Sequence, residues 1–272
     1  MEYIIERQHK FSLGLKELIR YRELFYFFAW RDIKVKYKQA ALGFLWAILQ
    51  PLAMMMIFTL IFSRGLRVSS EGIPYPIFAL SGLIIWNIFS NGLLNSANSM
   101  VANANIIKKI YFPRLIIPMS SILTALFDFC FSLLIYIAVL IFYNHNTDWL
   151  RVLYCLPVSI VLTVMTTLGL GTFLAALNVK YRDFQYVLPF MIQFLLFVNP
   201  VLYSSKIFEN GWLAWVMRLN PIANAINLSR SAFTGNAIDW MSVGLGFLVA
   251  LCFLLAGVYT FRKTEAYFAD LA

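Results

Sequence analysis

Long apolar runs separated by short polar stretches dominate the chain from about residue 44 onward. A helix needs roughly 20 residues to cross a bilayer core of about 30 Å. Six runs reach that length, and they cover residues 44–63, 76–99, 115–143, 152–177, 184–203 and 240–261. The pattern therefore predicts an all-α integral membrane protein with six transmembrane helices.

The segment between the last two runs, 204–239, contains two shorter apolar pieces. They cover 211–219 and 221–233, and Asn220-Pro221 separates them. Each is too short to span a membrane. Irregular backbone at membrane depth persists only where protein buries it or it lines water. We therefore expect an outer re-entrant pair of helices before the last crossing.

The first 43 residues are polar and also show helical periodicity. In a helix, Arg20, Glu23, Arg31, Lys34 and Lys38 fall within about 80° of arc, while Arg22, Asp32 and Lys36 break this pattern. This predicts an amphipathic helix on the inner leaflet, in which Asp32 and Lys36 stand one turn apart and can pair with each other. The expected organisation is an interface segment, 1–43, followed by a single transmembrane domain, 44–272.

Composition and charge support this assignment and add an orientation. Of the 272 residues, 61% are hydrophobic and 13% charged, whereas soluble domains carry roughly 25% charged residues. With the N-terminus inside, the inner segments hold 16 of the 22 Lys and Arg residues, as the positive-inside rule requires. Both termini are therefore expected in the cytoplasm. The net charge of +9 indicates contact with anionic lipid and not with nucleic acid.

Four cations stand directly before the first apolar run: Arg31, Lys34, Lys36 and Lys38. Two interpretations stay open for them. They form either a positive-inside anchor and nothing more, or a site that receives an anionic lipid headgroup at an inner gate.

Asp128 is the one carboxylate inside a predicted crossing. An ionisable group at that depth costs at least ~2.5 kcal/mol unless it finds partners or water. A structural role and a role in the transport pathway both remain open for it.

Aromatic residues make up 17% of the chain. Most are expected in interfacial belts and packing, and the remainder are candidates for stacking on sugar rings. The candidates near either mouth of a pathway are Trp86, Phe89, Tyr203, Trp212 and Trp215.

The sequence contains no G-x-x-x-x-G-K-[ST] phosphate loop, no cluster with metal-ligand spacing and no Ser/His/Asp or Cys/His set. We therefore expect a transport protein without enzymatic chemistry or a cofactor of its own. Any energy for transport has to come from another subunit or from an ion gradient.

Three stretches resemble the signature segments of one family: RDIKVKYKQAALGFLWAILQP (31–51), NANIIKKIYFPRLIIP (103–118) and ALNVKYRDFQYVLPF (176–190). The family is the permease subunits of type-2 ABC exporters, in the branch that exports O-antigen, capsular polysaccharide and teichoic acid. LNPIANAINLSR (219–230) resembles the outer loop of the same family.

The resemblance implies a homodimer of permeases with two separate ATP-binding subunits, which carry the ATP and Mg, in a bacterial inner membrane. It implies a polyprenyl-diphosphate-linked glycan as substrate and a short coupling helix in the loop 100–114. The residues at or beside that helix are Lys108, Lys109, Tyr111, Phe112, Pro113 and Arg114. It also implies that Arg182 and Asp183 help to order the inner side of the pathway.

Three alternatives stay open beside this reading. The first is a type-2 ABC permease for a drug or a simple lipid. The second is an ion-coupled secondary transporter, which predicts an internal repeat and several embedded ionisable groups; the sequence shows no clear repeat and one such residue. The third, an intramembrane glycosyl- or acyltransferase, needs an acid-base constellation that the sequence lacks.

Overall fold

The computed structural model describes residues 19–38, 45–66, 68–181, 183–208 and 211–265. Within these ranges every regular element is a helix, as the apolar runs predict. The helices are α2 (Arg22–Lys38), α3 (Leu45–Phe58), the π-helical segment η1 (Thr59–Gly65), α4 (Tyr75–Ala102), α5 (Ala104–Ile107), α6 (Ile116–Phe142), α7 (Trp149–Lys180), α8 (Phe184–Val198), the 3₁₀ turn η2 (Ser205–Phe208), α9 (Trp212–Leu219), α10 (Pro221–Thr234) and α11 (Trp240–Glu265).

Among the described residues, five helices are long and apolar enough to cross a membrane. They are α4, α6, α7, α11 and the continuous helix Leu45–Gly65 that α3 and η1 form together. These five correspond to five of the six predicted crossings.

The predicted crossing at 184–203 is wrong in its length. Helix α8 has 15 residues and is therefore about 22 Å long, which is short of a bilayer core. It ends at Val198 because Asn199 precedes Pro200, and a residue before proline is disfavoured in the helical region. Asn199 accordingly takes an extended conformation with ψ of 148°.

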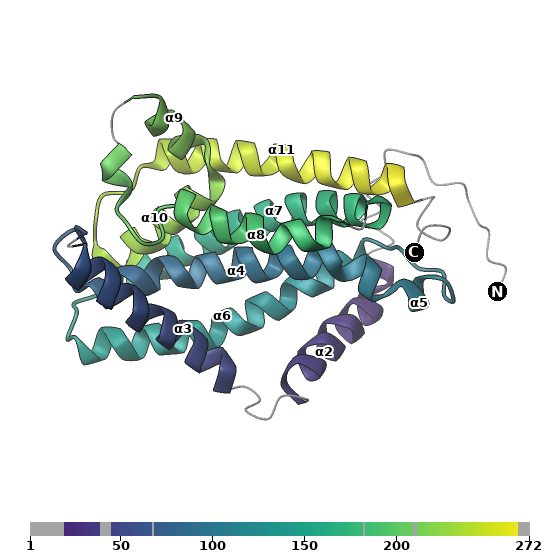
Figure 1. The fold of residues 1–272 in the computed structure, drawn as a ribbon, viewed down its shortest axis with the longest axis horizontal. Helices are drawn as coiled ribbons and strands as arrows, with labels where there is room; N and C mark the ends of the chain where they lie inside the picture. Colours follow the sequence, from purple (N-terminus) through teal and green to yellow (C-terminus); the bar gives the residue numbers. More distant parts are fainter. Residues whose placement is uncertain (1–18, 39–44, 67, 182, 209–210, 266–272) are drawn as a thin grey trace.

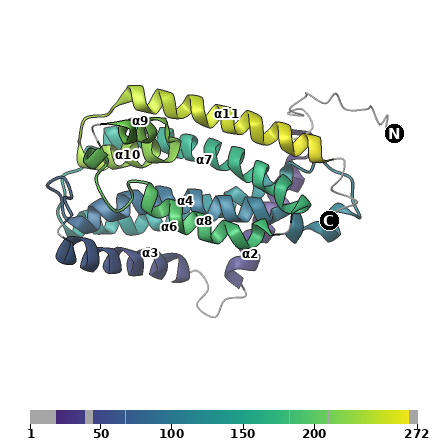
Figure 2. The same ribbon diagram turned by 45° about the horizontal axis from the view of Figure 1, so that its top comes forward.

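Helix α4 forms the centre of the bundle, where it packs against α6, α7 and α10. In its most apolar stretch 78% of the residues are buried, against 6% in the helix Leu45–Gly65. Figures 1 and 2 show α3 and α11 on opposite sides of the bundle. The apolar surface of α3 is therefore open to lipid or to another protein.

Helices α7 and α11 pack closely through two glycines. A Cβ atom on Gly257 would lie 2.0 Å from the Gly169 carbonyl oxygen, and one on Gly169 would lie 2.4 Å from the Phe253 backbone. Small residues at these positions let the two backbones touch, which is a common way of packing membrane helices.

The two helices predicted between the last crossings are present as α9 and α10, with ends within one residue of the prediction. Asn220 starts α10 because its side chain accepts hydrogen bonds from the backbone N–H groups of Ile222 (3.0 Å) and Ala223 (3.3 Å). Pro221 suits the first helical position. The helix ends at Gly235, whose φ of +76° favours glycine.

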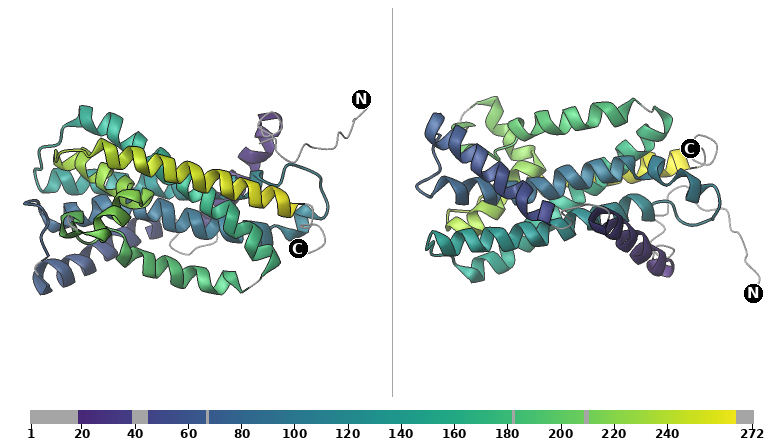
Figure 3. Two further views of the ribbon diagram at one scale, coloured as in Figure 1. Left: turned by 90° about the horizontal axis from the view of Figure 1, so that it is seen from above. Right: turned by 60° about the horizontal axis from the view of Figure 1, so that its bottom comes forward.

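The predicted amphipathic helix is α2, which packs against α6 and buries Phe28 and Ala29. It lies obliquely beside the bundle, on the face that also carries α3 (Figures 1 and 3). Phe28 joins a second core cluster at the α5 end of the bundle, where its ring centre lies 5.6 Å from that of Phe112.

Candidate functional site

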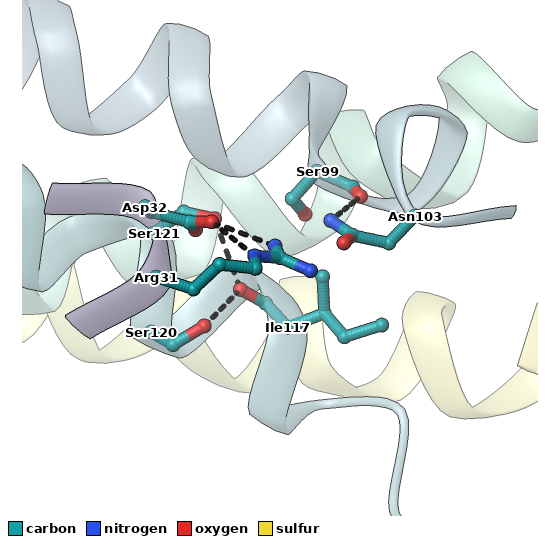
Figure 4. Close-up of polar contacts among 7 residues, drawn as sticks. All are labelled: Arg31, Asp32, Ser99, Asn103, Ile117, Ser120 and Ser121. Carbon is teal, nitrogen blue, oxygen red and sulfur yellow. Dashed lines mark hydrogen bonds and ion pairs between the residues drawn. The ribbon is translucent and has the colours of Figure 1, made fainter. Parts of the chain in front are cut away.

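A polar cluster occupies the junction of α2, α4 and α6 (Figure 4). The Arg31 guanidinium donates to one Asp32 oxygen from Nε (2.9 Å) and Nη2 (2.6 Å). Beside it, the Asn103 amide donates to the Ser99 carbonyl at 2.8 Å. Figure 4 shows the Arg31 guanidinium directed toward Asn103 and Ile117. The predicted Asp32–Lys36 pair is wrong, since Asp32 pairs with its neighbour Arg31 instead.

The partner of Lys36 is Asp128, 92 residues away in the sequence. Both the Lys36 ammonium and the Tyr37 hydroxyl donate to the Asp128 carboxylate. The Tyr37 ring also packs against Phe127 and Phe131, with centroid distances of 5.7 and 6.4 Å. Burial, together with the hydrogen bond to Asp128, raises the pKa of the Tyr37 phenol well above its usual range. Asp128 therefore has a cation and a hydroxyl as partners, which favours the structural interpretation of this residue.

This contact defines how α2 sits on α6. Asp128 lies 12 residues after the first residue of α6, or about 18 Å along the helix axis. The C-terminal end of α2 therefore reaches the middle of α6, while Phe28 contacts Phe112 just before α6 begins. Helix α2 is inclined along α6 and does not run perpendicular to it.

The four predicted headgroup cations differ in their surroundings. Arg31 and Lys36 are paired with carboxylates. Lys34, Lys36 and Lys38 are all exposed, but the Lys36 ammonium is held by Asp128. The Lys34 ammonium lies 5.3 Å from the centre of the Trp30 ring. In this conformation Lys34 and Lys38 are therefore the more accessible members of the set.

The residues predicted to couple to the ATPase follow α5, and all but Arg114 divide into an exposed and a buried group. Lys108, Lys109 and Tyr111 are exposed, Tyr111 to 79%. Phe112 and Pro113 are buried. The loop thus presents two cations and one aromatic ring outward, and its next two side chains hold it to the bundle.

Arg114 follows these residues and links the loop to the end of α11. Its backbone N–H donates to a Glu265 carboxylate oxygen at 3.3 Å, and its guanidinium donates to the Glu265 carbonyl. The loop after α7 contributes Asp183, which is exposed directly before α8. Arg182, predicted to act beside it, lies outside the described residues.

The candidate pathway aromatics also divide by exposure. Trp86 and Phe89 are only 5% and 2% exposed, and their rings pack on each other at 5.4 Å inside the bundle. Their burial leaves no open ring face for a sugar in this conformation. The Tyr203 hydroxyl donates to the Val198 carbonyl at 2.8 Å, at the end of α8. Trp212 and Trp215 on α9 are exposed.

Sequence reasoning missed Arg230, which is 3% exposed. Its Nη2 donates to the carbonyls of Pro200 (2.9 Å) and Val201 (3.1 Å), and its guanidinium carbon lies 3.7 Å from the centre of the Phe78 ring. One feature of the sequence could have pointed to Arg230: it is the one charged residue in the segment that forms α10. No such signal identifies Tyr37, whose role depends on a distant carboxylate.

Five membrane-length helices, with a cationic helix inclined across them, define a polytopic membrane protein. The chain belongs to the ABC-2 type transporter family, whose model matches residues 23–234. It is therefore a membrane permease component, and membership of this family implies that it works with ATP-binding subunits.

Several relatives align over most of their length. The O-antigen export system permease protein RfbA of Klebsiella pneumoniae is 30% identical over 241 residues, which cover 89% of this chain and 92% of the relative. RfbA of Myxococcus xanthus is 30% identical over 221 residues, covering 80% and 83%. The polysialic acid transport protein KpsM of Escherichia coli is 25% identical over 243 residues, covering 86% and 91%.

Proposed function

We propose that the chain is the permease subunit of an ATP-driven exporter that moves a lipid-linked polysaccharide across the bacterial inner membrane. The observation that carries this proposal is the alignment, over at least four fifths of each chain, with permeases named for O-antigen export. It favours a polysaccharide over a drug or a simple lipid. The substrate class is a polyprenyl-diphosphate-linked glycan.

The working unit in this proposal is a dimer of the chain with two ATP-binding subunits, which hold ATP and Mg. The absence of a phosphate loop from the sequence supports a separate ATPase subunit, and the open apolar surface of Leu45–Gly65 supports contact with a second copy. The end of the bundle that carries α5 faces the cytoplasm, as do both termini. Helix α8 and the buried non-helical residues that follow it, Val201 and Leu202 among them, together make the sixth crossing in this proposal, and α9 and α10 form the outer re-entrant pair.

The glycan carrier enters at α2 in this proposal. Its diphosphate meets Lys34 and Lys38, which are exposed, and forms charge-assisted hydrogen bonds with them. Arg31 and Lys36 can also bind the diphosphate, but only if they release their ion pairs with Asp32 and Asp128. Beyond the inner gate, Tyr203, Trp212 and Trp215 remain the candidate aromatics for the glycan.

Movement of the ATP-binding subunits reaches α2 through the loop after α5. Lys108, Lys109 and Tyr111 project outward from this loop to the ATPase, and Phe112 packs on Phe28 of α2. The ATP-binding subunit therefore docks on the exposed face of this loop, while α2 contacts the opposite face of the same loop. Movement of the loop on docking is in this way passed to α2.

Deletion of the gene tests the function. We expect the lipid-linked glycan to accumulate inside the cell and to disappear from the surface, with recovery on expression of the wild-type chain. Unchanged surface glycan, together with loss of drug or lipid efflux, would move the assignment to one of the alternative cargoes.

The coupling loop has its own test with a matched control. Tyr111→Ala is expected to reduce co-purification of the ATP-binding subunit and glycan export, without a change in the thermal stability of the permease. Phe142→Ala removes an equally exposed aromatic ring, 79% exposed, at the opposite end of α6, and is expected to leave both unchanged. Equal effects of the two substitutions would refute the role of Tyr111.

A further inference from the structure

A polar cavity of about 500 Å³ lies at the end of the bundle opposite α5. Its walls come from α9, α10, the first turns of α11, η2 and the turn that contains Glu71. The volume falls within the range of roughly 300–1,000 Å³ that is usual for small-ligand sites. Nothing in the proposed inner gate or coupling loop uses this cavity.

Arg230 is one of the residues that line the cavity, and its guanidinium is only partly satisfied by hydrogen bonds. Its Nη2 is held by the carbonyls of Pro200 and Val201, whereas its Nη1 is buried without a hydrogen-bond partner in the described part of the chain. Gly82 leaves the space for this arrangement, since a Cβ there would lie 2.9 Å from the Val201 oxygen and 3.1 Å from Nη2. A buried charged donor without an acceptor is unfavourable, and the contact of the guanidinium with the Phe78 ring offsets part of that cost.

The acceptors on the opposite wall are already occupied. The Glu71 carboxylate accepts hydrogen bonds from the Ser204 hydroxyl and, at 2.6 Å, from the Asn236 amide. The Lys206 ammonium lies 3.7 Å from the same carboxylate. Glu71 itself has φ of +58°, a conformation that few non-glycine residues adopt, and these three partners hold it in place.

The composition of the walls limits what can bind. Three cations, Lys206, Arg218 and Arg230, face two carboxylates, Glu71 and Asp239. Three amides also line the cavity: Asn224, Asn227 and Asn236. This near balance of charge disfavours a strongly anionic ligand, and side-chain amides offer both donors and acceptors. A compact polyhydroxylated molecule, a sugar, matches this set.

Exposed aromatic rings flank the same region. Trp215 on α9 lies beside the cavity-lining Arg218, whose guanidinium carbon is 5.6 Å from the Trp215 ring centre. A ring face next to a polar cavity suits a sugar, which has hydroxyl edges and an apolar face.

We propose that this cavity is an outer sugar-binding site, one in each copy of the chain, which holds a sugar residue of the glycan after it has passed the membrane. The inference deepens the proposed function and rests on it. Occupancy would keep the emerging polymer from sliding back while the ATP-binding subunits reset.

The test measures binding to the whole complex in lipid nanodiscs. The probe is the lipid-free repeat-unit oligosaccharide released from the surface glycan of the source strain, observed by saturation-transfer NMR. Because Arg230 substitutions are expected to disturb folding, the variants are Lys206→Ala and Asn227→Leu. Lys263→Ala, an exposed lysine at the opposite end of α11, is the matched control.

We expect the wild type and Lys263→Ala to bind the oligosaccharide alike, and each cavity variant to bind it about tenfold more weakly. Equal binding by all four proteins, or no binding by a complex that still exports glycan in cells, would overturn the site and leave the proposed function standing. A complex that exports no glycan at all would overturn both.

Discussion

Removing the Lys36 ammonium is expected to destabilise the protein more than removing its partner's charge. The side chain of Asp128 is 11% exposed and that of Lys36 is 43% exposed. Lys36→Met leaves a poorly exposed carboxylate in the middle of α6, and the Tyr37 hydroxyl is then its one side-chain donor among the described residues. Asp128→Asn leaves an amide that still accepts from Tyr37, and a lysine that can reach water.

The exposed fractions of these two side chains determine how much unfolding free energy each substitution is expected to cost. Breaking a fully buried ion pair from one side costs about 3–5 kcal/mol, and an exposed pair contributes under about 1 kcal/mol. Because the lysine half is partly exposed, Lys36→Met is expected to lower the free energy of unfolding by about 2 kcal/mol. Asp128→Asn is expected to lower it by less than about 1 kcal/mol. The double variant should resemble Asp128→Asn, which gives a coupling energy equal in size to the Lys36→Met effect, about 2 kcal/mol.

Unfolding in mixed detergent micelles, followed by tryptophan fluorescence, measures these differences. Lys34→Met is the matched control, because Lys34 lies two residues earlier on α2 and has no carboxylate partner among the described residues. It is expected to change stability by no more than ~0.5 kcal/mol. Additive effects of Lys36→Met and Asp128→Asn, or a larger effect of Asp128→Asn, would refute the reasoning.

Two further predictions concern packing and pH. Gly257→Ala places a Cβ atom 2.0 Å from the Gly169 carbonyl oxygen, and the forced separation of α7 and α11 is expected to cost about 1–3 kcal/mol; a lowered thermal midpoint would show this, whereas Gly244→Ala, which meets nothing within 4 Å, should leave the midpoint unchanged. The hydrogen bond from the Ser242 hydroxyl holds the pKa of Asp239 below its usual 3.8. A depressed carboxyl pKa stabilises the fold above the unfolded pKa, and that stabilisation disappears as pH falls through the folded pKa. The difference in thermal midpoint between wild type and Asp239→Asn should therefore be steady at neutral pH and shrink below about pH 4, and a difference that grows in acid would contradict this assignment.

Hydropathy predicts most of the helices because burial in lipid imposes length and composition on a helix regardless of its neighbours. Five crossings and the α9–α10 pair follow from that constraint. The predicted end of the fifth crossing was wrong because Val201 and Leu202 are apolar and continue the hydropathy pattern, although the helix has already ended before Asn199. These two residues are buried by the rest of the protein.

Side-chain partners were less predictable than helices. The spacing of Asp32 and Lys36 satisfies a local helical rule, but each has a different partner in the fold. Likewise, Trp86 has the residue type of an interfacial anchor and the environment of a core residue. Residue type and local spacing carry no information on which helix lies opposite, so the pairing of Lys36 with Asp128 required the tertiary structure.

Helix α2 connects the two ends of the proposed transport cycle. Phe28 ties it to the loop that presents Tyr111, and Lys36 and Tyr37 tie it to the middle of α6. In the proposed function Lys36 is also a candidate for binding the carrier diphosphate, so substrate arrival and ATPase docking are both proposed to act on α2. Asp128→Asn is therefore expected to keep basal ATP hydrolysis in the complex and to reduce its stimulation by lipid-linked glycan. If the Asp128→Asn complex assembles normally and its ATP hydrolysis is stimulated by the glycan as strongly as in wild type, α2 does not couple substrate binding to the ATPase. It would then be only a membrane anchor.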